Sequence, residues 1–254
     1  MKRKYEITDI QHPENPKLFR IRALHDMKKP HIKSGEIGGY IEHEGNLSHD
    51  GECWVHSKAV VSGNAHISDD AQISGNAQVY DTAQVYDNAR VYGNTQVYGN
   101  TQVFGDTRVY DYAEVYGNAH VFSGARIYGN ALVYGGSQVY GDSHMYGNVK
   151  VYKSAIVADN ARVFDNAQIF DAACLYGDAV AHGNAKLYGD AHVFRDVVIN
   201  ENMEISGESY IKSASQIYYA DRVTAFFDIH RILVVNGATP ETEFHKTLAI
   251  LKLS

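Results

Sequence analysis

The chain has 254 residues, and 23 Lys plus Arg against 30 Asp plus Glu give it a net charge of −7. The acidic excess lies in residues 55–218, which hold 10 basic and 17 acidic side chains, whereas the flanking segments are balanced. This balance disfavours general binding to nucleic acid or to an anionic membrane, although local basic strips remain compatible with it.

Cellular location is indicated by what the sequence lacks. The N-terminus has no apolar run typical of a signal peptide, and no stretch approaches the roughly 20 apolar residues of a membrane span. Cys53 and Cys174 are too few for a disulfide framework and fall in different positions of the repeat described below. We interpret them as unpaired thiols in a reducing compartment. The sequence therefore predicts a cytoplasmic protein without a membrane partner.

Residues 1–54 show no periodicity and are predicted to form an N-terminal cap. The segment Leu18–Met27 alternates apolar and basic residues, which predicts a strand. Gly35–Val55 is rich in glycine and leads into the periodic region. A segment of this kind is expected at the open end of a stacked repeat, because the end of the stack has to be covered.

From Val55 to Ile217 an aliphatic residue returns at every sixth position, in 28 slots of which only Ala181 is small. The residue two positions earlier is usually Ala, Thr or Ser. Because side chains alternate along a strand, both positions are predicted to point inward and their neighbours outward. Each repeat ends in pairs such as Gly93-Asn94, whose residue types tolerate the positive φ of a tight corner.

This pattern resembles the hexapeptide-repeat superfamily over about two-thirds of the chain. The resemblance implies an all-β fold, a left-handed parallel β-helix with three hexads in each triangular coil. Residues 55–218 would then form about nine coils and, at about 4.8 Å per coil, a rod about 45 Å long. The head followed directly by hexads also resembles the YdcK-like proteins of bacteria and prophages, for which acyl transfer is the suggested activity.

Residues 219–254 are predicted to form a small C-terminal cap of strands and a helix. The segment Thr224–Gly237 is typical of two short strands. Thr239 and Pro240 have the order expected of a helix start. Phe244, Leu248 and Leu251 then recur at helical spacing. Such a cap would block end-to-end pairing of the last coil.

The outward position after the aliphatic slot is aromatic in thirteen consecutive hexads, from Tyr80 to Tyr152. Every face of the rod should therefore carry an aromatic ladder. The rings could cover one another by stacking, or they could be buried in a homotrimer, the assembly common in the superfamily. The corner residues Asn76, Asn94, Asn130, Asn148, Asn166, Asn184 and Asn202 also recur at the coil period and predict a hydrogen-bonded amide ladder.

One face carries a second outward column, which we call the Arg–Tyr strip. Its members are Arg90, Arg108, Arg126, His144 and Arg162, flanked by Tyr92, Tyr110, Tyr128, Tyr146 and Phe164. Guanidinium groups beside aromatic rings can bind an extended anionic or sugar-like ligand by ion pairs and stacking. The alternative interpretation is that nearby acidic residues neutralise the column. These are Asp87, Asp106, Asp142, Asp159 and Asp178.

An acyltransferase would need a histidine within reach of the acceptor to act as general base. His120 and His144 are the candidates. His66, His120 and His192 share one face but lie three and four coils apart, so they cannot bind one metal ion within a subunit. The uninterrupted hexads leave no loop to enclose coenzyme A. Neither a metal nor a cofactor is therefore expected, unless a neighbouring subunit completes a site for acetyl-coenzyme A.

The favoured hypothesis is a non-enzymatic binding or scaffold protein of bacterial or prophage type, assembled as a homotrimer. Its contact surfaces would be the aromatic ladders and the Arg–Tyr strip, and its ligand a glycan, a nucleotide or a protein. Two alternatives stay open. One is an acyltransferase that uses acetyl-coenzyme A at a trimer interface. The other is an inhibitor whose acidic surface binds a basic host protein.

Overall fold

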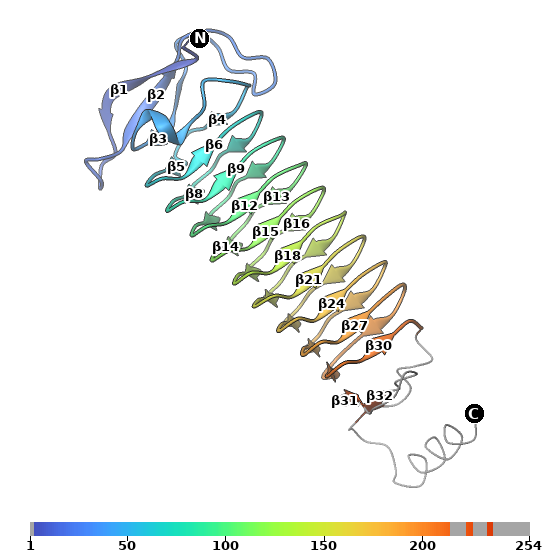
Figure 1. Ribbon diagram of the computed structural model, residues 1–254. Coiled ribbons are helices and arrows are strands. Elements are labelled where there is room, and N and C mark those ends of the chain that lie inside the picture. Colours follow the sequence, from blue (N-terminus) through green and yellow to red (C-terminus); the bar gives the residue numbers. More distant parts are fainter. Residues whose placement is uncertain (1–2, 214–221, 226–232, 236–254) are drawn as a thin grey trace, which may run out of the picture.

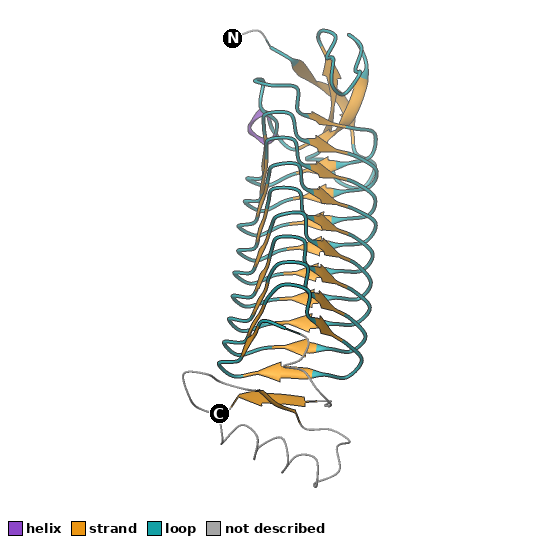
Figure 2. Ribbon diagram, turned by 90° about the vertical axis from the view of Figure 1, so that its right-hand side faces the viewer, coloured by secondary structure: helices purple, strands orange, loops and turns teal. Residues whose placement is uncertain are grey.

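The computed structural model describes residues 3–213, 222–225 and 233–235 and shows an all-β parallel solenoid of about ten turns (Figure 1). A small head packs on one end of the rod (Figure 2). Within the residues that the structure describes, no helix has the length and apolar character needed to cross a membrane. The predicted fold class is confirmed, and the left-handed sense of the coils stays a prediction.

The head contains three antiparallel strands, β1 (Tyr5–Gln11), β2 (Phe19–Ala23) and β3 (Ile37–Ile41). The strand predicted over Leu18–Met27 is thus confirmed only over β2, because Met27 instead bridges to Ile32. β3 also pairs in parallel with β5 of the solenoid, and a 3₁₀ turn, η1 (Glu44–Asn46), follows it. Parallel stacking therefore begins inside the segment predicted as the N-terminal cap.

Three sheets form the faces of the rod, and each hexad supplies one two-residue strand to one of them. The first face continues from β3 through β5 (Val60–Val61), β8 (Gln78–Val79), β11 (Gln96–Val97), β14 (Glu114–Val115), β17 (Leu132–Val133), β20 (Lys150–Val151), β23 (Gln168–Ile169), β26 (Lys186–Leu187) and the longer β29 (Glu204–Ser206). The second face consists of β4 (Trp54–Val55), β7 (Gln72–Ile73), β10 (Arg90–Val91), β13 (Arg108–Val109), β16 (Arg126–Ile127), β19 (His144–Met145), β22 (Arg162–Val163), β25 (Val180–Ala181) and β28 (Val198–Ile199). The third face consists of β6 (His66–Ile67), β9 (Gln84–Val85), β12 (Gln102–Val103), β15 (His120–Val121), β18 (Gln138–Val139), β21 (Ile156–Val157), β24 (Cys174–Leu175), β27 (His192–Val193) and β30 (Tyr210–Ile211).

The core is filled by the two inward positions of each hexad, as predicted. The aliphatic slots from Val55 to Ile211 are buried, and so are the small residues before them apart from the partly buried Met203. Thr95, Thr101 and Thr107 are inward too, and their hydroxyl groups donate to backbone carbonyls three residues earlier, at 3.3, 3.0 and 2.6 Å. Satisfying these hydroxyls locally lets polar residues occupy an otherwise apolar column.

The corners between strands have the positive φ that the sequence predicts. Gly93 and Gly117 adopt φ of 83° and 77°, and Asp87 and Asp159 adopt 57° and 60°. Aspartate at such a corner also binds the next coil. Asp87 Oδ2 accepts from the Gly105 N–H at 3.1 Å, and Asp159 Oδ2 from the Gly177 N–H at 2.9 Å. The acidic corner residues thus join successive coils.

The predicted asparagine ladder is confirmed by side-chain amides that bond from coil to coil. Asn76 Nδ2 donates to Asn94 Oδ1 at 2.8 Å. The ladder resumes at Asn130 and runs to Asn202 with separations of 3.1–3.2 Å. Tyr112 occupies the interrupting position and is 62% exposed. One column of asparagine side chains therefore connects successive coils by hydrogen bonds along a single corner of the rod.

At the C-terminal end, β31 (Arg222–Ala225) adds to β29 in parallel and β32 (Leu233–Val235) pairs with β31 antiparallel. Two short strands in this region were predicted from the sequence. The helix predicted from Thr239 onward, and the last aliphatic slot, Ile217, lie outside the described residues.

We expect Gly141→Ala to lower the free energy of unfolding by at least about 1–2 kcal/mol, the cost of a left-handed φ for an L-residue. Gly141 has φ of +73°, and an added Cβ would lie 2.5 Å from the Asp159 carbonyl oxygen. Gly136→Ala is the matched control, since its Cβ would meet only ordinary contact at 3.5 Å. Urea unfolding midpoints of the two variants measure the difference, and equal losses would contradict the corner argument.

Candidate ligand-binding surface

The second face aligns the predicted cationic residues in one column. Parallel register places Arg90 opposite Arg108, Arg108 opposite Arg126, Arg126 opposite His144 and His144 opposite Arg162. The four arginines are exposed and His144 is half-buried. Consecutive members are separated by about one coil, or about 4.8 Å. The residues predicted for the Arg–Tyr strip are therefore brought together in one continuous row.

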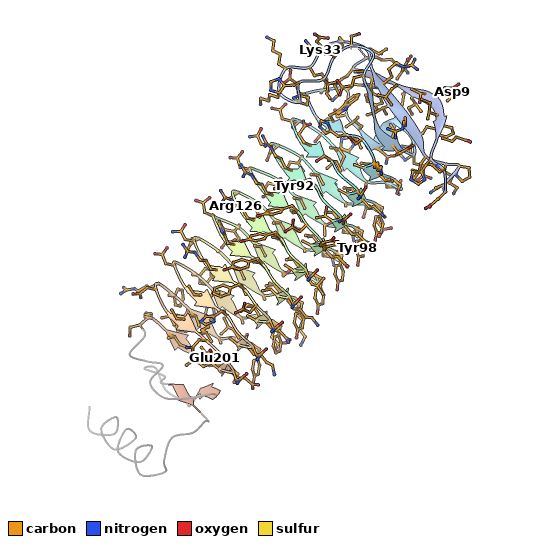
Figure 3. The ribbon with its side chains drawn as sticks, turned by 180° about the vertical axis from the view of Figure 1, so that it is seen from behind. Asp9, Lys33, Tyr92, Tyr98, Arg126 and Glu201 are labelled. Atoms are coloured by element: carbon orange, nitrogen blue, oxygen red, sulfur yellow. The ribbon has the colours of Figure 1, made fainter. Side chains whose placement is uncertain are left out.

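The aromatic half of the strip is a stack that covers itself. From Tyr92 to Phe164 and on to His182, neighbouring ring centroids are 4.8–5.0 Å apart and the planes differ by 2–11°. The rings are half-buried. Figure 3 places Tyr92 and Arg126 along one side of the rod and Tyr98 along another.

This stacking changes what the strip can offer a ligand. Each ring face is occupied by the ring of the next coil, so the prediction that a ligand stacks on these aromatics is wrong for the interior of the column. The outward edges and the phenol hydroxyl groups remain. Burial raises the pKa of the Tyr110 and Tyr128 hydroxyls, and neighbouring tyrosines raise it further. The phenols are thus neutral groups that can donate as well as accept hydrogen bonds.

Four of the five aspartates near the column form hydrogen bonds within the solenoid. Besides the backbone bonds of Asp87 and Asp159, Asp106 Oδ1 accepts from the Asn88 amide at 3.1 Å and Asp178 Oδ1 from the Asn160 amide at 3.0 Å. Within the described part of the chain, none of the four column arginines lies within 4.0 Å of a carboxylate. Among the described residues these arginines therefore form no direct ion pair with the aspartates, and neutralisation of the column by the nearby carboxylates stays an alternative prediction.

A shallow groove of about 420 Å³ lies where the column meets the head. It is lined by Lys29, Asp70, Gln72, Asn88, Arg90, Asp106 and Arg108. Two strip residues that the sequence predicted, Arg90 and Arg108, are thus part of its wall. The groove is mixed in charge, with three cations and two carboxylates, and opens along the second face.

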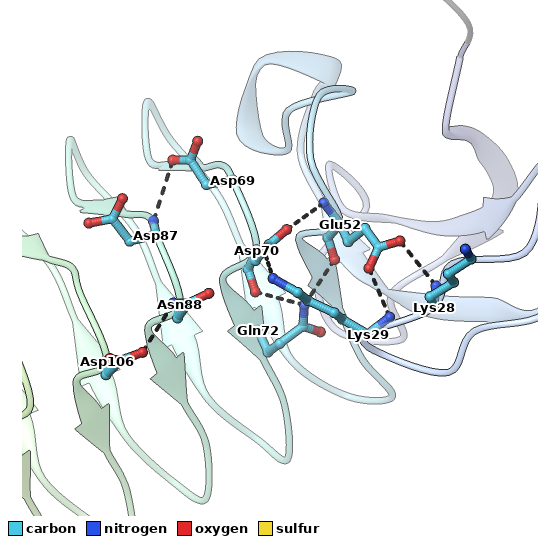
Figure 4. A network of polar contacts seen from close by, with 9 residues as sticks. All are labelled: Lys28, Lys29, Glu52, Asp69, Asp70, Gln72, Asp87, Asn88 and Asp106. Carbon is cyan, nitrogen blue, oxygen red and sulfur yellow. Dashed lines mark hydrogen bonds and ion pairs between the residues drawn. The ribbon is translucent and has the colours of Figure 1, made fainter.

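The head supplies Lys29 through a polar network (Figure 4). The Glu52 carboxylate accepts from the backbone N–H groups of Lys28 and Lys29 at 3.1 and 2.8 Å. The Lys29 ammonium pairs with Asp70, whose other oxygen accepts from the Glu52 N–H at 3.1 Å. Sequence reasoning missed Lys29, because it lies in the aperiodic head and no repeat pattern relates it to the column.

The two candidate general bases lie apart. His120 belongs to β15 on the third face, whereas His144 belongs to β19 on the second. Burial lowers the pKa of His144, and the positive charges of Arg126 and Arg162 lower it further. In the part of the chain that the structure describes, His, Cys, Asp and Glu side chains form no cluster able to hold a metal ion.

Comparison with protein families agrees with this architecture. A family model described as the YdcK beta-solenoid repeat matches residues 83–100 and 125–141. Both stretches lie inside the rod, and the first spans one complete coil, from β9 to β11 with its corners. The fold and these repeats define the chain as a β-solenoid repeat protein. None of the curated proteins matches the chain in sequence.

We expect the His144 imidazole to titrate below the ordinary histidine pKa of about 6.5, and Arg126→Gln to raise its pKa partway, since burial persists. NMR titration of the histidine ring protons measures both values. Arg90→Gln, three coils away, is the control and should leave the His144 pKa unchanged. Because the unfolded chain takes up this proton first, His144 should lower stability as the pH falls through its unfolded pKa.

Proposed function

We propose that this β-solenoid scaffold binds an extended acidic polymer, specifically an acidic polysaccharide, along the Arg–Tyr strip. The observation that carries the proposal is the exposed arginine column, whose four guanidinium groups have no ion pair in the described structure. A row of like charges repels itself, so an anionic ligand would stabilise it. Four of the flanking aspartates accept hydrogen bonds at the corners and, in the described part of the rod, form no direct ion pair with the column.

Ligand class follows from the groups that the strip exposes. Arginine forms paired hydrogen bonds with carboxylate or sulfate groups. Tyrosine hydroxyl groups beside it suit the hydroxyl-rich rim of a sugar chain. Nucleobases would require open ring faces to stack on, and the ring faces of this column are covered by one another. The exposed chemistry therefore favours an acidic glycan over a nucleotide or a nucleic acid.

The repeat also favours binding over catalysis. Each coil presents nearly the same contact, so affinity would accumulate along a polymer rather than at one reacting bond. The candidate bases His120 and His144 lie on different faces, so they would not act at one site within a subunit. The groove beside Lys29 would hold one end of the polymer, because there the head adds a wall to the otherwise open strip.

Replacing two central arginines, in Arg108→Gln with Arg126→Gln, is expected to weaken binding of an alginate or heparin oligosaccharide about tenfold. Two exposed ion pairs contribute up to about 1 kcal/mol each, and about 1.4 kcal/mol corresponds to tenfold in Kd. Isothermal titration calorimetry at low and moderate salt measures the change. The affinity of the unmodified protein should fall as salt screens the contacts.

The control is Lys58→Gln with Lys150→Gln, which removes the same charge from outside the strip. Lys150 is exposed on the first face and Lys58 at a corner. This variant should bind as the unmodified protein does. Equal weakening in both variants would reduce the effect to net charge, and an unmodified protein that binds neither acidic glycan would overturn the proposal. Tighter binding of a single-stranded oligonucleotide would overturn the choice of a glycan.

We also propose that the protein assembles as a homotrimer through aromatic ladders outside the strip. On the first face Tyr80, Tyr98, Tyr116, Tyr134, Tyr152, Phe170 and Tyr188 stack at 4.8–5.0 Å and stay half-exposed. A long ladder of half-exposed aromatic side chains suits a subunit contact. Light scattering coupled to size exclusion should give three times the 28.2 kDa chain mass. A monomer would contradict the assembly and leave the glycan proposal standing.

A further inference from the structure

A lysine is buried against a cysteine where the head meets the first coil. Lys4 is 1% exposed and Cys53 is fully buried. The Lys4 ammonium nitrogen lies 3.0 Å from the Cys53 sulfur and 3.4 Å from the carbonyl oxygens of Asp50 and Gly51. Lys4 immediately precedes β1, and Cys53 occupies the inward position before β4. The contact therefore joins two segments 49 residues apart in the chain.

Among the described residues, Cys53 is the one ionisable side chain that accepts a hydrogen bond from the Lys4 ammonium group, whereas the Lys4 backbone N–H donates to His49 Nδ1 at 3.3 Å. No carboxylate lies within ion-pair distance of Lys4 there. A buried ammonium group without a counterion is costly. The acceptors around this ammonium group are the Cys53 sulfur and the carbonyl oxygens of Asp50 and Gly51. Burial raises the pKa of Cys53, and the Lys4 charge opposes that rise.

We propose that Lys4 and Cys53 are a site of oxidative cross-linking, with hydrogen peroxide as the oxidant. Peroxide converts the thiol to a sulfenic acid: S–OH replaces S–H, and the peroxide is reduced to water. One proton of the Lys4 ammonium group passes to water, and the resulting amine attacks the sulfur. An S–N bond forms, the S–O bond breaks, and the hydroxide leaves as water with a proton from the amine. The product is a sulfenamide, and a thiol reductant restores both side chains.

Geometry favours this step over further oxidation of the sulfur. Reacting atoms about 3–3.5 Å apart are already in a near-attack arrangement, and the nitrogen and sulfur are 3.0 Å apart. Peroxide reaches the buried pair when the N-terminal segment opens locally, so the reaction is slow. Once formed, the bond fixes residue 4 to the first coil and restricts the unfolded head, which raises the melting temperature.

Cys174, the second cysteine of the chain, serves as an internal control for this reaction. Cys174 is also buried, and its thiol lies 3.4 Å from the Ala172 carbonyl oxygen. Its neighbours on the third face are Ile156 and His192, which have no primary amine. Cys174 should therefore stop at sulfenic acid or oxidise further under conditions that cross-link Cys53.

The test treats the full-length protein with hydrogen peroxide, followed by digestion and mass spectrometry. The expected product is a pair of peptides joined through Lys4 and Cys53. Its mass should be lower by two hydrogen atoms than the sum of the masses of the two unmodified peptides. It should disappear on treatment with dithiothreitol. The melting temperature should rise with peroxide in the unmodified protein and return after reduction.

Cys53→Ala is the control variant, because alanine is the commonest residue in this inward position and should fold normally. It should give neither the cross-linked pair nor the rise in melting temperature. Lys4→Gln keeps the thiol and should yield only oxygen adducts at Cys53. Complete oxidation of Cys53 in the unmodified protein without a linked pair would overturn the proposal. A linked pair that retains one oxygen and is cleaved by dithiothreitol would overturn the S–N bond in favour of an N–O–S bridge.

Discussion

The parallel register between coils is the constraint on which the rest of the structure depends. Each residue lies over its equivalent in the next coil, so one choice at a hexad position is repeated as a column along the rod. The effect of a column depends on its chemistry. Valines fill the core, amides form the ladder from Asn130 to Asn202, and aromatic rings stack at 4.8–5.0 Å. Stability is thus the sum of neighbouring-coil contacts.

The same constraint accounts for the acidic balance of the rod. A residue with a side chain at a positive-φ corner often lies beside a glycine at the same corner of the next coil. Asp87 is followed one coil later by Gly105, and Asp159 by Gly177. In both pairs the carboxylate accepts the glycine N–H. Much of the acidic excess therefore consists of carboxylates that connect coils at the corners. This structural role weakens the hypothesis of an inhibitor whose acidic surface binds a basic host protein.

Most of the fold could be predicted because it is periodic. The inward columns, the positive-φ corners and the asparagine ladder all follow from residue type at a fixed spacing. The head could not be predicted to the same detail, since its contacts are particular to it. Gly38, for example, is required because a Cβ there would lie 2.6 Å from Ile21 and from the Val55 carbonyl oxygen. The network of Lys29 and Glu52 is equally aperiodic.

For the candidate site, the sequence predicted which residues form columns. It did not predict which groups of those residues stay accessible to a ligand. It gave the positions of Arg108, Tyr110 and their equivalents, because register follows from the period. It could not show that the aspartates bind corner amides, or that each ring face is covered. Those outcomes depend on side-chain direction, which the period alone leaves open. These two findings changed the expected ligand. A ligand that stacks on the aromatic rings is replaced by one that contacts the ring edges, the phenol hydroxyl groups and the guanidinium groups.

The arginine column is the feature of the rod that the fold does not require. The equivalent outward position on the other faces is often glutamine, as at Gln78 and Gln96 on the first and Gln84 and Gln102 on the third. Glutamine at that position is neutral and compatible with the same strands. Arginine in consecutive coils instead places like charges opposite one another, which destabilises a sheet pair. A costly column that neutral residues could replace is the observation that best supports the proposal of an anionic ligand.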